Sequence, residues 1–126
     1  MMKEVIFYKE APAAVGPYSH ASDCGNLVFL SGQVPLVPAT GLIAEGGIKG
    51  QARQMFSNIE AVLKSCGLGF DNVVKTTVFM TDLADFNTFN AIYAEYFPTN
   101  PPARSCVQVA ALPKGALVET ECICVK

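Results

Sequence analysis

Arg104 is the residue whose position points most directly to chemistry. It follows Pro101, Pro102 and Ala103 and opens a predicted strand, residues 104–112, whose other eight positions carry no charge. A guanidinium fixed at such a place suits a planar carboxylate, because its fork gives two charge-assisted hydrogen bonds in one geometry. A solvated arginine at a strand end, or one paired with an acidic neighbour, is the alternative that the residues leave open.

Two carboxylates and one thiol are the other reactive groups in this part of the chain. Glu119 and Glu121 share one face of the last predicted strand, since successive side chains of a strand alternate. A carboxylate partly withdrawn from water beside a ligand is a general base toward water. Cys106 shares a face with Arg104, and we interpret it as a small buried thiol, because the single histidine, His20, is poorly placed to activate it.

Several polar groups lie where rigid or apolar segments end. Tyr18 follows a Gly-Pro pair, Ser31 precedes Gly32, and Asn90 stands among the aromatic residues of a predicted helix. Their hydroxyl, amide and backbone groups are candidate ligand contacts. They equally suit turns and a helix surface. His20 is interpreted as a structural or surface residue.

The elements that position these groups fit into one domain, residues 1–126, because 126 residues is an ordinary length for a single core. Hydrophobic residues make up 51% of the chain and charged residues only 16%, against a usual value of about 25%. This composition excludes disorder. It also leaves apolar surface for another copy of the chain to cover, so we expect an oligomer.

Charge and cysteine content exclude several classes of function. The net charge is −2 and no run of Lys or Arg occurs, which disfavours nucleic acid as a partner. The five cysteines lack Cys-x-x-Cys spacing, so we expect free thiols, no metal and a reducing compartment. No apolar run is long enough for a signal peptide or a membrane span. We therefore expect a cytoplasmic protein that does not enter a membrane.

Hydrophobic periodicity and turn residues predict the order β-β-β-α-β-α-β-β. Strands are expected at 4–8, before a hairpin turn at Gly25-Asn26, and at 27–30, 72–81, 104–112 and 117–125. Residues 48–66 repeat apolar positions three or four apart, which predicts a helix with Gln51, Gln54 and Asn58 among the polar residues of its opposite side. A second helix is expected between the cap candidates Asp82 and Asp85 and the terminator Pro98.

This order is typical of an α+β fold with a mixed six-stranded sheet and two helices on one face. The expected strands carry apolar residues on both faces, for example Val107, Val109 and Ala111 opposite Cys106 and Ala110. Two helices cover one face only. The other face is therefore expected to pack on another subunit.

Six stretches of the sequence form a recognisable set. They are Gly16-Pro17-Tyr18-Ser19, Leu30-Ser31-Gly32-Gln33, Gln51-Ala52-Arg53-Gln54 with Asn58, Val74-Lys75-Thr76-Thr77-Val78-Phe79, Asp82-Leu83-Ala84-Asp85-Phe86, and Pro102-Ala103-Arg104-Ser105-Cys106-Val107 with Val118-Glu119. At these residues the sequence resembles the YjgF/RidA family of reactive-intermediate deaminases, also called the L-PSP family. The resemblance runs nearly end to end, and the last stretch is its most specific part. Two departures are small: His20 stands where many members have Gln, and Thr120 where an aliphatic residue is usual.

The resemblance implies a chorismate-mutase-like fold, a homotrimer and a pocket at each subunit interface. It also implies hydrolysis of 2-iminobutanoate and 2-iminopropanoate, released by pyridoxal-phosphate dehydratases, to a 2-keto acid and ammonia, with no cofactor. Arg104 would bind the substrate carboxylate and Glu119 would orient or deprotonate the attacking water. Groups near Ser31, Gly32 and Cys106 would hold the imine, and Tyr18 and Asn90 would close the pocket wall.

Two other functions stay open at this point. One is an endoribonuclease that cleaves single-stranded RNA and inhibits translation, an activity associated with relatives of the family. The acidic balance and the single histidine stand against it. The other is a trimer that binds carboxylates through Arg104, or acts like a chaperone, without turnover.

Overall fold

The computed structural model describes residues 3–14 and 16–126, which form six strands and two α-helices. Short 3₁₀ turns precede β4, α2 and β6. In chain order the elements are β1 (Glu4–Ile6), β2 (Ala21–Asp23), β3 (Leu27–Gln33), α1 (Gly47–Ser65), β4 (Val73–Met80), α2 (Phe86–Tyr96), β5 (Ala103–Gln108) and β6 (Val118–Val125).

The strands form one mixed sheet in the order β1-β2-β3-β6-β4-β5. β1, β2 and β3 are antiparallel neighbours, and β6 lies antiparallel between β3 and β4. β5 is parallel to β4 at the edge of the sheet, with α2 in the crossover that a parallel pair requires. The predicted α+β class and its mixed six-stranded sheet are confirmed.

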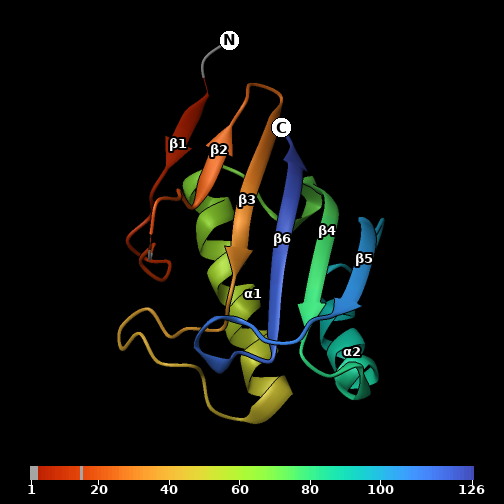
Figure 1. The fold of residues 1–126 in the computed structure, drawn as a ribbon. Helices are drawn as coiled ribbons and strands as arrows, with labels where there is room; N and C mark the ends of the chain where they lie inside the picture. Colours follow the sequence, from red (N-terminus) through yellow and green to blue (C-terminus); the bar gives the residue numbers. More distant parts are fainter. Residues whose placement is uncertain (1–2, 15) are drawn as a thin grey trace.

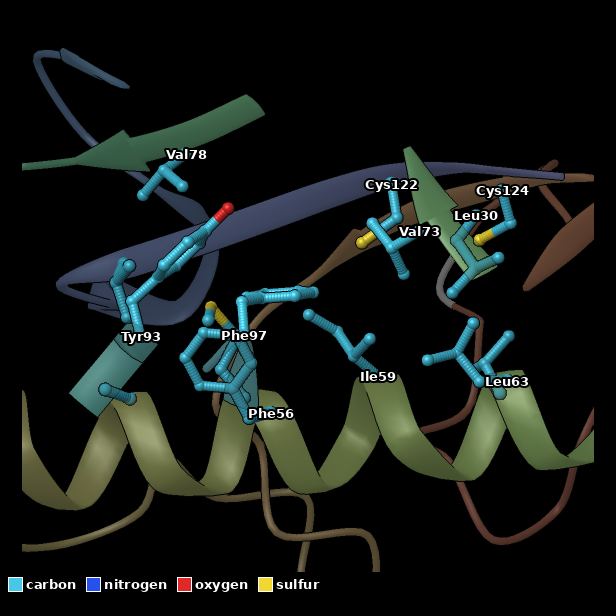
Figure 2. Packing of buried hydrophobic residues seen from close by; sticks show 14 of the residues in the cluster. Leu30, Phe56, Ile59, Leu63, Val73, Val78, Tyr93, Phe97, Cys122 and Cys124 are labelled. Carbon is cyan, nitrogen blue, oxygen red and sulfur yellow. The ribbon is translucent and has the colours of Figure 1, made fainter. Parts of the chain in front are cut away.

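Both helices cover the same face of the sheet, and they lie behind it in Figure 1. Figure 2 shows Phe56, Ile59 and Leu63 of α1 directed toward β6, the strand that carries Cys122 and Cys124. Aromatic rings join the two helices, since the Phe56 ring stacks on Tyr96 with ring centroids 4.3 Å apart. Burying this apolar area is the main stabilising contribution to the fold.

The helix ends follow from local sequence. α1 begins after Gly46, whose φ of 101° is in the left-handed region, and the chain leaves it at Gly67, with φ of 72°. At the approach to α2, the Asp82 carboxylate accepts a hydrogen bond from the backbone N–H of Ala84 at 2.8 Å. α2 ends just before Pro98, as the sequence predicts.

Three strands differ from their predicted bounds by two residues or more. β1 ends at Ile6 instead of Tyr8, because the chain turns there, with the N–H of Ala11 donating to the carbonyl of Tyr8 at 3.1 Å. β3 continues through Ser31 and Gly32 to Gln33, because a bulge keeps it paired with β6. β5 ends at Gln108, so the prediction of a strand to residue 112 is wrong. β4, the neighbour of β5, ends at Met80, whose carbonyl already accepts from the N–H of Val109 at 2.8 Å. Beyond this point no strand is available to pair with residues 110–112 of the edge.

The sheet face away from the helices, here called the open face, carries large apolar side chains. Phe29 of β3 is 41% exposed and Val107 of β5 is 44% exposed. Phe79 and Ile123 share this face by strand alternation and are partly exposed. The open face therefore has the apolar character that the sequence predicts for a subunit contact.

Candidate active site

A pocket of about 490 Å³ lies where β3 and β6 meet the loops. Four of the predicted site residues line it, Tyr18, Ser31, Gly32 and Glu119, and we call them the pocket cluster. Val34 and Leu36, in the segment after β3, form another part of the wall, and Lys114 lies at the turn before β6. The irregular stretch between β3 and α1 thus supplies part of the pocket wall.

Glu119 is an ionisable residue of the pocket wall, and its surroundings raise its pKa. Its carboxylate is half-buried, and no hydrogen bond or ion pair reaches it within residues 3–14 and 16–126. Loss of solvation raises the pKa of Glu119, and the nearby Glu121 carboxylate raises it further. A carboxylate with a raised pKa and no partner is suited to take a proton from water.

Gly32 is required by the position of that carboxylate. Gly32 lies in the irregular part of the β3–β6 pairing, between Leu30 and Gln33. A Cβ at this position would overlap the carboxylate of Glu119. Glycine is therefore the residue type that lets the acidic group lie against the β3 backbone.

Ser31 connects β3 to the loop that carries Tyr18. Its hydroxyl donates to the carbonyl of Ser19 at 2.6 Å, and its backbone N–H donates to the carbonyl of His20 at 3.0 Å. The hydroxyl oxygen keeps acceptor capacity toward the pocket. Ser31 thus holds the Tyr18 loop in place, while the Tyr18 side chain itself is exposed.

Arg104, Asn90 and Cys106 form a second group, here called the arginine cluster. One guanidinium nitrogen of Arg104, Nη1, donates to Oδ1 of Asn90 at 2.6 Å. The guanidinium carbon lies 4.7 Å from the ring centroid of Tyr93 and 5.4 Å from that of Phe86. No carboxylate lies within salt-bridge distance of Arg104 in the described part of the chain. The planar cation is held in place with donors left for an anion.

The thiol of Cys106 and the ring of His20 are both poor candidates for acid-base chemistry. Burial raises the pKa of Cys106, although the neighbouring Arg104 lowers it, so the neutral thiol is favoured. His20 is buried, its Nδ1 accepts from the N–H of Tyr8 at 2.8 Å, and its Nε2 lies 2.7 Å from the carbonyl of Pro12. Both ring nitrogens are used to hold the N-terminal segment, which agrees with a structural histidine.

The two clusters lie on opposite faces of the sheet. Glu119 pairs with Phe79 and, beyond it, Val107, on the open face. Arg104 is three positions before Val107 and pairs with Thr76, whose side chain is buried under α2. Two strand spacings across and three residues along separate the groups by roughly 10 Å in each direction, with the sheet between them. One copy of the chain therefore cannot place both groups on one small molecule.

Two buried amides were assigned to the wrong side of α1 by the sequence interpretation. Gln51 and Asn58 were placed among its polar, outward residues, but both are buried. Their amides hydrogen-bond to backbone groups of the loops around the pocket, so burial is compensated. The pattern of hydrophobic residues contains no signal for partners of this kind.

No three His, Cys, Asp or Glu side chains among the described residues come close enough together to hold a metal ion. Neither helix in that part of the chain combines the length and the apolar character needed to cross a bilayer.

Comparisons with known proteins add a family and several relatives. The family model described as "Endoribonuclease L-PSP" matches residues 8–126. Human 2-iminobutanoate/2-iminopropanoate deaminase is 44% identical over 126 residues, which cover 100% of this chain and 92% of the relative. Chloroplastic Reactive Intermediate Deaminase A of Arabidopsis thaliana is 51% identical over 121 residues, which cover 96% of this chain and 65% of that longer protein.

Solved structures share the fold at similar identity. The crystal structure of Escherichia coli TdcF with bound serine has a TM-score of 0.93 and 43% sequence identity, and the match covers 98% of each chain. A small amino acid is thus bound by a protein whose backbone closely resembles this one.

Proposed function

The chain belongs to the endoribonuclease L-PSP family, also called the YjgF/RidA family, and on that premise we propose that it hydrolyses small 2-imino acids. The products would be a 2-keto acid and ammonia, and the proposed substrates are 2-iminobutanoate and 2-iminopropanoate. The names of the human and Arabidopsis relatives support a deaminase. The observation that carries the proposal is the Glu119 carboxylate, which lines the pocket, has no partner among the described residues and has a raised pKa.

The reaction needs the protein to orient the substrate and to supply one general base. Glu119 accepts a proton from water as the water oxygen adds to the imine carbon, and it then returns this proton to the nitrogen, which gives a carbinolamine and regenerates the carboxylate. The hydroxyl proton then moves to the nitrogen while the C–N bond breaks, which releases ammonia and leaves the keto group. Because imines also hydrolyse unaided, the acceleration can come from orientation and general base catalysis.

Arg104 would bind the carboxylate of the same substrate from a neighbouring copy of the chain. Its fork matches a carboxylate, and Asn90 with two aromatic rings fixes its orientation. The opposite placement of Arg104 and Glu119 supports a site shared between copies, and so does the exposed apolar open face. The proposed assembly is a homotrimer with one site per interface, and its mass in sedimentation equilibrium would be three times 13.4 kDa.

Turnover is tested with the purified protein added to a pyridoxal-phosphate threonine dehydratase in the presence of semicarbazide. Semicarbazide traps free 2-iminobutanoate, so an imine hydrolase lowers the yield of trapped imine and raises that of free 2-ketobutyrate. A binder without turnover lowers the trapped imine only up to its own molar amount. The same preparation is incubated with single-stranded RNA, and cleavage there without imine hydrolysis would contradict the proposal.

The ribonuclease alternative gains no support from the site. Both ring nitrogens of His20 are engaged with backbone groups. The ionisable residue with a raised pKa at the pocket is a carboxylate, Glu119. RNA cleavage without a metal needs acid-base groups placed on either side of a phosphate. Lys114 is the basic residue among those that line the pocket.

The cytoplasm is the compartment that we propose. All five cysteines are free, which fits a reducing environment. The Arabidopsis relative is described as chloroplastic, so location varies among relatives. Cell fractionation with an antibody to the chain tests the proposal.

A further inference from the structure

Three amide side chains of α1, Gln51, Gln54 and Asn58, lie at its packed face or beside it and form hydrogen bonds outside the helix ladder. Gln51 and Asn58 are buried and stand two helical turns apart on the same side of α1. A helix that packs on a sheet normally presents apolar side chains there, because each buried amide must find partners to offset its desolvation. The partners of these two amides therefore need an explanation.

Asn58 is bonded to the pocket wall. Its Nδ2 donates to the carbonyl of Val34 at 3.0 Å and to that of Leu36 at 2.9 Å. Its Oδ1 accepts from Nε2 of Gln54 at 3.0 Å, which fixes which way the amide faces. Val34 and Leu36 line the pocket and lie after the end of β3. Their segment is therefore outside the hydrogen-bond ladder of that strand.

Gln51 is bonded to the chain that leads into the general base. Its Oε1 accepts from the backbone N–H of Leu117 at 2.8 Å. Leu117 lies one residue before β6 and two before Glu119. The contact joins α1 to the point where the chain leaves the turn at Lys114 and enters the strand.

We propose that α1 positions two walls of the pocket separately: Asn58, oriented by Gln54, holds the substrate-binding wall at Val34 and Leu36, and Gln51 holds Glu119 through Leu117. This inference rests on the proposed function for its kinetic consequences, and on geometry alone for its structural ones. The three amides are positioning residues that act through backbone groups. They lie behind the pocket, on the helix side of the sheet.

The two walls would respond differently in kinetics. The wall at Val34 and Leu36 contacts the substrate throughout the reaction, so its loss weakens uniform binding and raises KM. Displacement of Glu119 weakens proton transfer in the transition state, so it lowers kcat. The Asn58→Leu variant should raise KM about 10-fold with kcat nearly unchanged, and Gln51→Met should lower kcat about 10-fold with KM nearly unchanged.

Replacing each amide by the corresponding acid gives a second, sharper test. Gln51→Glu keeps the oxygen that accepts from Leu117, so its kcat should stay within about 3-fold of the parent. Asn58→Asp replaces Nδ2, which donates to both carbonyls, by an oxygen atom that faces them, so it should be at least as impaired in KM as Asn58→Leu. The same chemical change is thus expected to have opposite outcomes at two sites of one helix. Gln54→Leu should give a smaller increase in KM, about 3-fold, and serves if the Asn58 variants do not fold.

Hydrogen exchange supplies a measurement that does not need activity. The Asn58 and Gln54 variants should exchange faster in residues 34–44, where the N–H of Val37 donates to Leu42 and that of Ala44 donates to Pro35. Gln51→Met should exchange faster at the N–H of Leu117. Ser65→Ala is the matched control, because it removes another side-chain hydrogen bond of α1, from Ser65 Oγ to the carbonyl of Val62, away from the pocket.

The outcomes separate this inference from the proposed function. Local, distinct exchange changes together with the KM and kcat division support it. Equal changes in both segments, unchanged exchange, or the same changes in Ser65→Ala would overturn it. If the parent chain shows no imine hydrolysis, the proposed function fails, and the exchange pattern alone decides whether α1 positions the two walls.

Discussion

The pocket cluster and the arginine cluster treat their charges in opposite ways. Glu119 lies half-buried with no partner in the part of the chain that the structure describes, and desolvation raises its pKa. Arg104 is held by Asn90 and lies over two aromatic rings, which stabilise a permanent charge in one orientation. The difference indicates two roles. Glu119 is suited to change its protonation state, whereas Arg104 is suited to keep a permanent charge in one orientation.

The largest expected effect comes from removing the base. Glu119→Gln has nearly the same size but cannot accept a proton, so kcat should fall by about 10²–10⁴. Cys106→Ser should keep much of the activity, because the neutral thiol contributes packing and a weak hydrogen bond. Semicarbazide trapping measures both variants, with circular dichroism as the folding control. An inactive Cys106→Ser beside an active Glu119→Gln would reverse the roles, and a thiol adduct would then be sought by mass spectrometry.

The next effect concerns the fixed charge. Arg104→Lys keeps the charge but loses the fork and the planar stacking, and Arg104→Ala loses all three. Activity should fall in that order, by about 10-fold and about 10²-fold, and 2-ketobutyrate binding measured by calorimetry should weaken in parallel. An Arg104→Ala variant that hydrolyses 2-iminobutanoate like the parent would show that the arginine cluster takes no part.

A mixing experiment tests whether the two clusters complete each other between copies. Arg104→Ala and Glu119→Gln are each expected to be nearly inactive alone. After unfolding and refolding together in equal amounts, about a quarter of the interfaces should combine an intact Arg104 with an intact Glu119, and activity should return to that fraction. If each cluster worked only within its own chain, the mixture would stay as inactive as its components.

A smaller effect is expected on the stability of the fold, from a substitution at Thr120, the residue after Glu119. Thr120 is fully buried, and its hydroxyl has no hydrogen-bond partner among the described residues. Thr120→Val replaces the hydroxyl by a methyl group of similar size, so the free energy of unfolding should rise by about 1 kcal/mol. The urea midpoint at pH 7 measures it, and Thr76→Val is the control expected to destabilise, since the Thr76 hydroxyl bonds to that of Tyr93 at 2.7 Å.

The smallest effect is the pH dependence of stability that Glu119 causes. Because its pKa is raised on folding, the folded chain holds this proton more tightly than the unfolded chain, so stability is lost as pH rises above about 4.3 toward the folded value. Glu119→Gln should therefore raise Tm by about 1–2 °C at pH 7 and leave it unchanged near pH 4, a small gain because the group is half-exposed. A lower Tm at pH 7 would show that the carboxylate stabilises the fold through contacts between copies.

The sequence predicts the fold well where one side of an element is apolar. The spacing of Met55, Phe56, Ile59 and Leu63 predicts α1 to within a residue, because an amphipathic helix needs no information from outside itself. The end of β5 was missed, since it depends on where the neighbouring strand β4 stops. The end of a strand depends on the neighbouring strand with which it pairs, so the sequence of one segment does not determine it.

The candidate site divides in the same way. Residue type made Arg104 and Glu119 candidates, because charges in apolar strands are rare and costly, and the family resemblance supplied their expected roles. Their placement on opposite faces follows from a register in which three strands align, and Gln51 and Asn58 depend on loop carbonyls that no periodicity reveals. The sequence therefore indicated which residues are reactive, whereas their contacts with other segments became known only from the structure.

The central position of β6 has a consequence for how the chain folds. Of the six strands, β6 is the last to be synthesised, yet it lies between β3 and β4 and pairs Cys124 with Val28, far earlier in the chain. Until it inserts, β3 and β4 are two unjoined edges, and the core over α1 stays open. Closure of such distant segments is slow, so folding should be delayed until β6 has left the ribosome, and nascent chains should be sensitive to proteases and chaperones up to that moment.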